Sequence, residues 1–321
     1  MPSRSSMVGS DELCSFGTLL YPEEAMEPIL SRPVRGALLA WLEEMFAQRE
    51  LEDVDLKPRR RAMFTGVPGV GKTTLAHHLA ARLGLPMLCV QSEDIIESWL
   101  GATEQNIGAL FRAVAKAGDV ILFFDEFDTL GARRENTRGG DRGGAQRAMN
   151  AAVNVLLRRI EQAGCMIIAA TNYADRIDPA IWRRFDIHID LDLPGQEERE
   201  RIVERYLSPF GLPARPLRLL AEALATASPS LIRQLCEALK RNMVLGERIG
   251  WDMRKQQTLD RIVAAIQPHP DLGKPALWAH GASSIAVEAL PWPLPMAGDL
   301  PAAEVSTVAT VGGTVVPLHG R

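Results

Sequence analysis

The segment 66–73 reads Gly-Val-Pro-Gly-Val-Gly-Lys-Thr and has the spacing G-x-x-x-x-G-K-T. Glycines in this pattern let backbone N–H groups close around phosphate oxygens at the N-terminus of the following helix. Lys72 is expected to reach the β- and γ-phosphates of a nucleotide, and the Thr73 hydroxyl to ligate Mg²⁺. An apolar run before the loop and a helical segment after it provide the context that this chemistry needs. The predicted contacts to ATP and Mg²⁺ come from Gly66, Pro68, Gly69, Val70, Gly71, Lys72, Thr73 and Thr74.

Two adjacent carboxylates, Asp125 and Glu126, follow the apolar run 120–124. In an open parallel sheet, ligands bind at the carboxyl ends of the strands, where such residues meet. Asp125 is expected to hold Mg²⁺, while Glu126 orients and deprotonates the attacking water. Because a kinase would not need a base at this position, the glutamate favours hydrolysis of the nucleotide.

A further apolar run, 167–170, ends in Thr171 and Asn172. The neutral amide of Asn172 is placed to hold the attacking water or the γ-phosphate. Arg183 and Arg184 follow on a short predicted helix, from which they cannot easily fold back onto their own site but could project into a neighbour's. Taken alone, such a pair is more typical of a solvated surface, but the spacing after Asn172 favours a role in a shared site.

The elements that must position these residues are short apolar runs that alternate with helical segments. This alternation predicts βαβ units and a parallel sheet covered on both faces. The predicted fold class is therefore α/β, with a five-stranded parallel P-loop sheet, helices on both faces and a small helical lid domain after it. The strands are expected at 62–65, 87–90, 120–124, 166–170 and 187–193, with intervening helices beginning near Lys72, Ser92, Ala145 and Pro179.

The chain divides into four predicted regions. After Pro194 the apolar periodicity is purely helical, which indicates a separate lid, and beyond Pro268 the prolines argue against any continuous helix. We expect the tail to be disordered, the alternative being a docked hairpin over 305–316 around Gly312-Gly313. The regions are a mobile leader at 1–24, a large nucleotide-binding domain at 25–193, the helical lid at 194–267 and a Pro-, Ala- and Gly-rich tail at 268–321.

Composition narrows the class of protein. The 321 residues are 46% hydrophobic and 24% charged, enough for one large or two modest folded domains. A net charge of −4 with dispersed Lys and Arg residues makes nucleic acid an unlikely partner. The four cysteines lack C-x-x-C spacing, so they are expected to be reduced thiols. With no export signal or membrane-length apolar run in the sequence, the predicted location is the cytoplasm.

At these residues the sequence resembles the classical AAA ATPase family, from about residue 28 to about residue 244. The segment 66–73 is similar to Walker A, 121–126 to Walker B, and 171–186 to the second region of homology of classical AAA proteins. This resemblance implies that Asn172 is sensor 1 and that Arg183 and Arg184 are paired arginine fingers reaching an adjacent subunit. It also implies a homo-oligomer, usually a hexamer, that hydrolyses ATP only when assembled.

Residues 98–104, which include Trp99 and Leu100, resemble the first pore loop of the family. In the family this loop grips a polypeptide in the central channel. We expect an exposed loop at this place, the alternative being that Trp99 is a core aromatic. The glycine- and arginine-rich segment 131–144 falls where the family has its second pore loop, although it could be an ordinary surface loop.

The sequence departs from the family pattern in two places. The inter-subunit signalling segment is degenerate at 161–164, so coupling between subunits is expected to differ. The Ser-Gly-Ala-Asp element of the lid is replaced at 228–231, which leaves open whether Ser230 or Arg233 faces the phosphates. The chain resembles compact bacterial members of the family, some of which accompany a protease.

Together these features predict an ATP-hydrolysing AAA ring motor that remodels or unfolds a protein substrate or partner. One alternative is a nucleotide-gated scaffold that regulates a partner, such as a protease, without threading it. The other is a DNA-directed motor. Stimulation of ATP turnover by unfolded polypeptide, by the partner alone or by DNA would separate the three.

Overall fold

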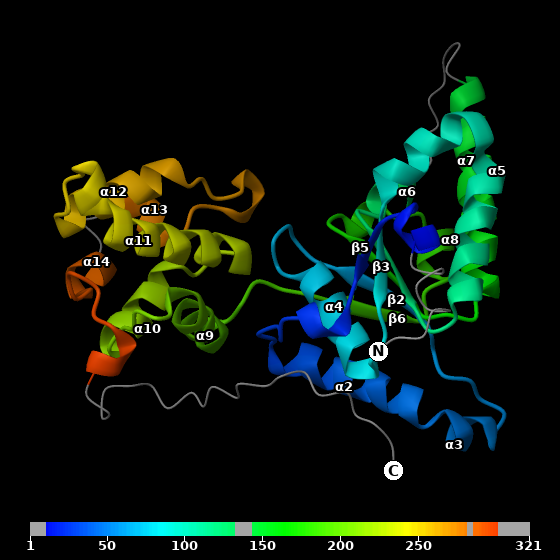
Figure 1. Ribbon diagram of the computed structural model, residues 1–321, viewed down its shortest axis with the longest axis horizontal. Coiled ribbons are helices and arrows are strands. Elements are labelled where there is room, and N and C mark those ends of the chain that lie inside the picture. The colour runs from blue at the N-terminus through cyan, green and yellow to red at the C-terminus, as the bar shows by residue number, and fades with distance from the viewer. Residues whose placement is uncertain (1–10, 132–142, 281–284, 301–321) are drawn as a thin grey trace.

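The computed structural model describes residues 11–131, 143–280 and 285–300. An α/β body and an all-helical body lie side by side, and the chain passes from one to the other directly after the last strand (Figure 1). The predicted division near Pro194 coincides with this passage. No helix among the described residues is both long enough and apolar enough to cross a membrane.

The sheet of the α/β body has six strands in the order β1-β3-β4-β5-β2-β6. The five strands β2 to β6 are parallel, as predicted, whereas β1 pairs with β3 in the antiparallel direction. The prediction of five strands from the sequence therefore missed one edge strand, β1. The strands are β1 (Thr18–Leu20), β2 (Arg61–Thr65), β3 (Met87–Gln91), β4 (Ile121–Asp125), β5 (Ile167–Thr171) and β6 (Ile187–Asp190).

The strand β1 corrects the prediction of a mobile leader over 1–24. Its three residues are too few to show any periodicity, yet Thr18 pairs with Cys89 of β3. The backbone at Gly17 approaches β3 so closely that a Cβ there would lie 2.2 Å from the carbonyl oxygen of Cys89. Leu13 is also buried against the core of the sheet. The described part of the leader is thus an edge of the folded body.

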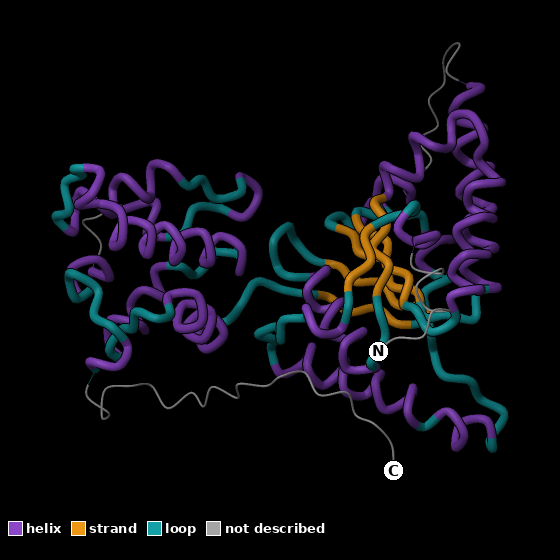
Figure 2. Tube along the Cα trace, viewed as in Figure 1, coloured by secondary structure: helices purple, strands orange, loops and turns teal. Residues whose placement is uncertain are grey.

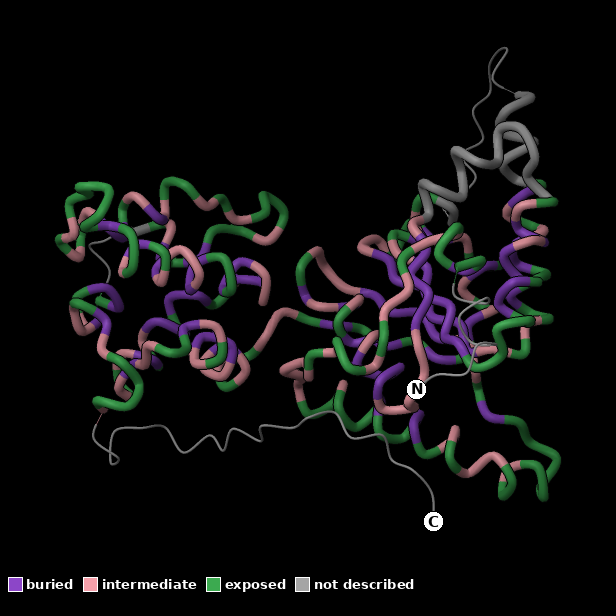
Figure 3. The backbone as a smooth tube through the Cα atoms, in the orientation of Figure 1, coloured by how far each residue is buried: buried purple, intermediate pink, exposed green. Residues whose placement is uncertain are grey.

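Helices cover both faces of the sheet, and the strands between them are buried (Figures 2 and 3). One core lies between the sheet and the helices α2 and α4, and the other lies between the sheet and α5 and α7. Trp41 of α2 is fully enclosed, and its indole N–H donates to the carbonyl of Arg59, 2.7 Å away. The helices of this body are α2 (Arg32–Phe46), α3 (Gln48–Glu52), α4 (Lys72–Leu83), α5 (Ser92–Ala117), α6 (Asp128–Gly131), α7 (Gly143–Gln162) and α8 (Pro179–Trp182).

The helical body extends well beyond the predicted boundary at 267. Its core includes Leu277, Val287 and Leu294, all from the region predicted to be a disordered or docking tail. That prediction is wrong for the described part of the tail, and the predicted hairpin over 305–316 lies outside the described residues. The helices of this body are α9 (Gln196–Leu207), α10 (Ala214–Ala223), α11 (Pro229–Ile249), α12 (Lys255–Ala265), α13 (Ala276–His280) and α14 (Ile285–Ala289).

The physical reason is that prolines prevent a long helix without preventing burial. Helices α13 and α14 are short, and two tryptophans anchor the irregular chain around them. The indole N–H of Trp278 donates to the carbonyl of Ile266, and that of Trp292 donates to the carbonyl of Met253, each over 2.7 Å. Each ring therefore buries apolar area while its polar atom stays satisfied.

If this segment belongs to the core, Leu277→Ala lowers the free energy of unfolding of the helical body by about 2–5 kcal/mol, because it leaves a cavity. Leu277 is fully buried, with 0% exposure. Urea denaturation measures the change. The matched control is Ile285→Ala, since Ile285 is 73% exposed and its truncation is expected to cost less than about 0.5 kcal/mol. Equal stability of the two variants would contradict the core assignment.

Candidate active site

The phosphate-binding loop joins the end of β2 to the start of α4, as predicted. Gly66 has φ +141° and Gly69 has φ +79°, conformations that L side chains rarely adopt. A Cβ on Gly66 would lie 2.3 Å from the carbonyl oxygen of Leu191, so the loop also passes too close to the chain after β6 to accept a side chain. Glycine is therefore required here for both conformation and space.

Lys72 lies at the first turn of α4 and is only 7% exposed. Its Nζ donates to the carbonyl of Gly66 at 2.7 Å, to that of Val67 at 3.2 Å and to Oδ1 of Asn172 at 2.6 Å. Burial lowers the pKa of Lys72, and nearby carboxylates, Asp125 foremost, act to raise it. The two residues predicted from separate segments of the sequence, Lys72 and Asn172, are thus in direct contact.

Thr73 and Asp125 also come together, with the Thr73 hydroxyl donating to Oδ2 of Asp125 over 3.0 Å. A hydroxyl and a carboxylate side by side are oxygen donors of the kind that Mg²⁺ takes in sites that it shares with nucleotide phosphates. The residues present therefore fit the predicted ion.

Glu126 turns away from β4 in the left-handed conformation, with φ +49°. Its backbone N–H donates to Oδ1 of Asp125 at 3.0 Å, and its carbonyl accepts from the Thr129 hydroxyl at 2.9 Å. A non-glycine residue in this conformation costs on the order of 1 kcal/mol and needs such surrounding contacts to persist. The turn leaves Glu126 exposed on the wall of the cleft, beside Asp125.

Asp128 is a site residue that the sequence reasoning did not identify. Its Oδ1 accepts from the hydroxyl of Thr171 at 2.9 Å and from the backbone N–H of Asn172 at 3.3 Å. It therefore fixes the end of β5 and, with it, the amide that contacts Lys72. The signal was available, because Asp128 follows Asp125 and Glu126 at the start of a helix.

A cavity of about 330 Å³ joins the loop to the helical body and lies within the size range of small-ligand pockets. Its lining includes Asp125, Glu126 and Asn172 on one side and Ser230 and Arg233 on the other. The backbone N–H of Ser230 donates to the carbonyl of Gly69 at 3.2 Å, so the lid touches the loop directly. Both lid residues left open by the sequence line the cleft, and Arg233 is the one that brings a charge.

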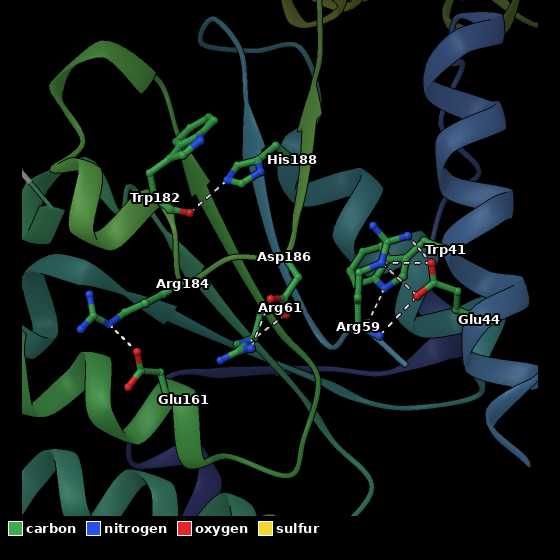
Figure 4. A network of polar contacts seen from close by, with 9 residues as sticks. All are labelled: Trp41, Glu44, Arg59, Arg61, Glu161, Trp182, Arg184, Asp186 and His188. Atoms are coloured by element: carbon green, nitrogen blue, oxygen red, sulfur yellow. Dashed lines mark hydrogen bonds and ion pairs between the residues drawn. The ribbon is translucent and has the colours of Figure 1, made fainter. Parts of the chain in front are cut away.

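The two arginines behind β5 are not equivalent, and neither belongs to the lining of this cleft. Arg183 is exposed, whereas the Nε of Arg184 lies 2.7 Å from Oε1 of Glu161 on α7 (Figure 4). The guanidinium of Arg184 also donates to the carbonyl of Ala180. Arg184 is therefore tied within its own chain, and Arg183 faces outward.

The short segment that carries the arginines is braced to the sheet on both sides. Before it, the Trp182 ring stacks on His188 of β6 with centroids 4.0 Å apart, and the His188 ring nitrogen meets the Trp182 carbonyl at 3.2 Å (Figure 4). After it, Asp186 pairs with Arg61 of β2, with a closest approach of 3.0 Å. These contacts fix the direction in which the segment leaves the body.

The predicted pore-loop residues Trp99 and Leu100 lie within α5, so the backbone there is helical where an exposed loop was expected. Their side chains are outside the described part of the structure. Most of the segment 131–144, the second predicted pore loop, also lies outside the described residues.

Comparisons with known proteins agree with this geometry. Residues 62–193 match the ATPase family associated with various cellular activities (AAA). The uncharacterized AAA family ATPase y4kL of Sinorhizobium fredii is 34% identical over 222 residues, which are 68% of this chain and 65% of that protein. ATP-dependent zinc metalloprotease FtsH 1 of Symbiobacterium thermophilum is 33% identical over 221 residues, 65% of this chain and 36% of that protein. The matched region is thus less than two thirds of either relative.

A solved structure is similar in fold. The crystal structure of the FIGL-1 AAA domain superimposes with a TM-score of 0.65 at 17% identity and covers 87% of this chain and 95% of that domain. The two-body architecture is therefore shared with an AAA domain of distant sequence.

The roles predicted for Lys72 in phosphate recognition and for Glu126 in water activation can be tested separately by two substitutions. We expect Lys72→Ala to abolish nucleotide binding, because it removes the buried cation of the loop. Glu126→Gln keeps the shape of the cleft, so it is expected to bind ATP and lower turnover by about 10²–10⁴-fold. Calorimetry and phosphate release measure the two effects. The control is Glu50→Gln, an exposed carboxylate on α3. Wild-type turnover by Glu126→Gln would remove this residue as the base.

Proposed function

We propose that this chain, which matches the AAA ATPase family over residues 62–193, hydrolyses ATP and assembles into a ring that remodels or unfolds a protein substrate. The observation that carries the proposal is the meeting of Lys72, Asp125, Glu126 and Asn172 in one cleft beneath a helical lid. Lys72 comes from the start of α4 after the loop that follows β2, Asp125 and Glu126 lie at the end of β4, and Asn172 follows the end of β5. The activity, substrate and partners of the whole protein rest on this site.

In the proposed reaction, the phosphates displace the loop carbonyls from the ammonium group of Lys72. Asn172 then holds the γ-phosphate or the attacking water, and Glu126 takes the proton from that water. Thr73 and Asp125 would hold Mg²⁺, which neutralises phosphate charge when it is bound. Arg233 of the lid supplies a second cation from the opposite wall of the cleft. Hydrolysis would therefore change the phosphate charge that lies between Lys72 of the loop and Arg233 of the lid.

The outward position of Arg183 supports a site that is completed by a neighbouring subunit. A single chain places this charge outside the lining of its own cleft, so a role in hydrolysis would have to be at the cleft of a neighbouring subunit. An arginine supplied in this way is worth about 10³–10⁵ in rate in other phosphoryl-transfer systems. We propose a homo-oligomeric ring, a hexamer in the form usual for the family, in which Arg183 acts as the finger. Arg184 instead stabilises the segment through Glu161.

The protein substrate is proposed from the resemblance of Trp99 and Leu100 to a pore loop. A protease is the proposed partner class, since a similar region occurs in a relative named as an ATP-dependent zinc metalloprotease. The helical backbone at Trp99 favours the second candidate function, a nucleotide-gated scaffold that regulates a partner without threading it. We propose the cytoplasm as the location, because the four cysteines are free thiols.

If Arg183 is the finger, Arg183→Ala leaves ATP binding near normal and lowers turnover by about 10³-fold or more. Arg184→Ala is expected to have a smaller effect, since Arg184 is held by Glu161. Mixing Arg183→Ala subunits with Glu126→Gln subunits restores part of the turnover, because some interfaces then pair an intact base with an intact finger. Arg215→Ala, an exposed arginine of the helical body, is the control. Normal hydrolysis by Arg183→Ala as an isolated monomer would contradict the shared site.

A threading motor and a nucleotide switch differ in the role of Trp99. If Trp99 grips polypeptide, Trp99→Ala keeps basal ATP turnover and thermal stability but loses stimulation by an unfolded protein. If it is a core residue, its truncation costs about 3–5 kcal/mol and basal activity falls in parallel. A thermal melt and a turnover assay on one preparation measure both. Unchanged stimulation would reject threading through this residue, and stimulation by DNA instead of protein would favour the third alternative.

A further inference from the structure

A second cavity lies at the amino ends of the parallel strands, whereas the nucleotide cleft lies at their carboxyl ends. Its lining includes Leu85, Val120 and Met166, which stand directly before or near the amino ends of β3, β4 and β5. Its volume is about 660 Å³, twice that of the nucleotide cleft and well within the range of small-ligand sites. None of the residues assigned to ATP binding or hydrolysis lines it, so it is separate from the nucleotide cleft.

The walls of this cavity are largely apolar. They come from residues of the helices α2, α3, α4, α5 and α7, together with the chain that leads into the strands. The apolar lining side chains include Met45, Leu83, Leu85, Phe111, Val114 and Met166. A cavity of this kind favours a ligand with an apolar body, because binding removes both surfaces from water.

Three guanidinium groups add a strong positive charge to these walls. Arg112 of α5 and Arg159 of α7 both reach over the bare backbone of Gly108, where a Cβ would lie 3.1 Å from one guanidinium nitrogen of Arg112 and 3.9 Å from one of Arg159. The third, Arg60, donates to the carbonyl of Gly164 and to Oε1 of Gln48. Two helices and the segment before β2 thus direct cations to one cavity.

This charge is not neutralised by the protein where its side chains are described. Arg60 is held by an amide oxygen and a carbonyl, and neither Arg112 nor Arg159 forms an ion pair with a described carboxylate. Asp119 is the one carboxylate in the lining. Both side chains are exposed, so water screens their mutual repulsion, but an anion bound between them would accept hydrogen bonds from both guanidinium groups. The planar forks of arginine suit carboxylate and phosphate oxygens in particular.

We propose that this cavity binds a small amphipathic anion, with its carboxylate or phosphate held by Arg112 and Arg159 and its apolar body on the walls. The proposal rests on the cavity alone and does not depend on the nucleotide site. Gly108 leaves the backbone bare beneath the two guanidinium groups, where a Cβ would be in contact with both. The position of the cavity among the ends of α4, α5 and α7 would let such a ligand stabilise the packing of these helices.

Isothermal titration calorimetry of the full chain with octanoate and with octyl phosphate tests the proposal. We expect at least one probe to bind with one-to-one stoichiometry, and Arg112→Ala and Arg159→Ala each to weaken it by about tenfold or more, the loss of one charge-assisted contact. The matched control is Arg158→Ala, an exposed arginine beside Arg159 that does not line the cavity. Inorganic phosphate has the anionic group without the apolar body, and octanol has the apolar body without the charge, so both are expected to bind more weakly.

A second measurement locates the probe independently of the arginine variants. Cys165 lines the cavity, so a bound probe is expected to slow its modification by a neutral maleimide. The exposed Cys14 is replaced by Ser in this assay, and unchanged ATP binding confirms that each variant is folded.

The proposal fails if neither octyl probe binds, if Arg158→Ala weakens binding as much as the other two variants, or if Cys165 is not protected. Equally tight binding of inorganic phosphate would reduce the site to simple anion attraction and overturn it. Sedimentation with phosphatidic acid vesicles without binding of octyl phosphate would overturn it in favour of a membrane surface.

Discussion

The ammonium group of Lys72 is buried, so it needs hydrogen-bond acceptors within the protein. The position of the strands in the α/β body provides these acceptors. Its partners are two carbonyls of its own loop and the amide of Asn172 from a different strand. The contact forms only because β2 and β5 are parallel neighbours whose carboxyl ends finish level, with Thr65 opposite Thr171. Asp128 fixes the same strand end by accepting from Thr171 and Asn172. The ammonium group that we propose to recognise phosphate is thus held in place by its own loop and by Asn172, and the phosphates would take over the contacts that the loop carbonyls make.

The lid completes the cleft by contact with the loop as well as by proximity. A Cβ on Gly69 would lie 2.3 Å from the hydroxyl oxygen of Ser230, so the loop and the lid are packed backbone to side chain at this point. The helical body that carries Ser230 is larger than its periodic helices alone suggest, because the proline-rich chain after α12 closes its core. In the proposed ring, a change in the loop after hydrolysis would act on this packed helical body through the contact between Gly69 and Ser230.

The arginine segment and the second cavity show how the same body uses its other surfaces. The segment after α8 is held by the stacked Trp182 and His188 on one side and by the Asp186–Arg61 pair on the other. Such bracing directs Arg183 away from its own cleft. The cavity at the amino ends of the strands is lined in part by the last turn of α4, whose first turn lies in the nucleotide cleft. The nucleotide cleft, the arginine segment and the second cavity are therefore all positioned by one sheet and the helices that cover it.

The sequence alone determined the features that depend on local spacing. The phosphate loop, the carboxylate pair, the five parallel strands and the boundary near Pro194 all follow from patterns within a single segment. It could not reveal the three-residue strand β1, because so short an element has no periodicity and is specified by its partner β3. It also could not reveal that isolated Leu277, Val287 and Trp292 close a core, since burial depends on distant helices. Nor could it distinguish Arg183 from Arg184, which are neighbours of the same type. Only the tertiary structure, by bringing Glu161 beside one of them, decided that they have different surroundings.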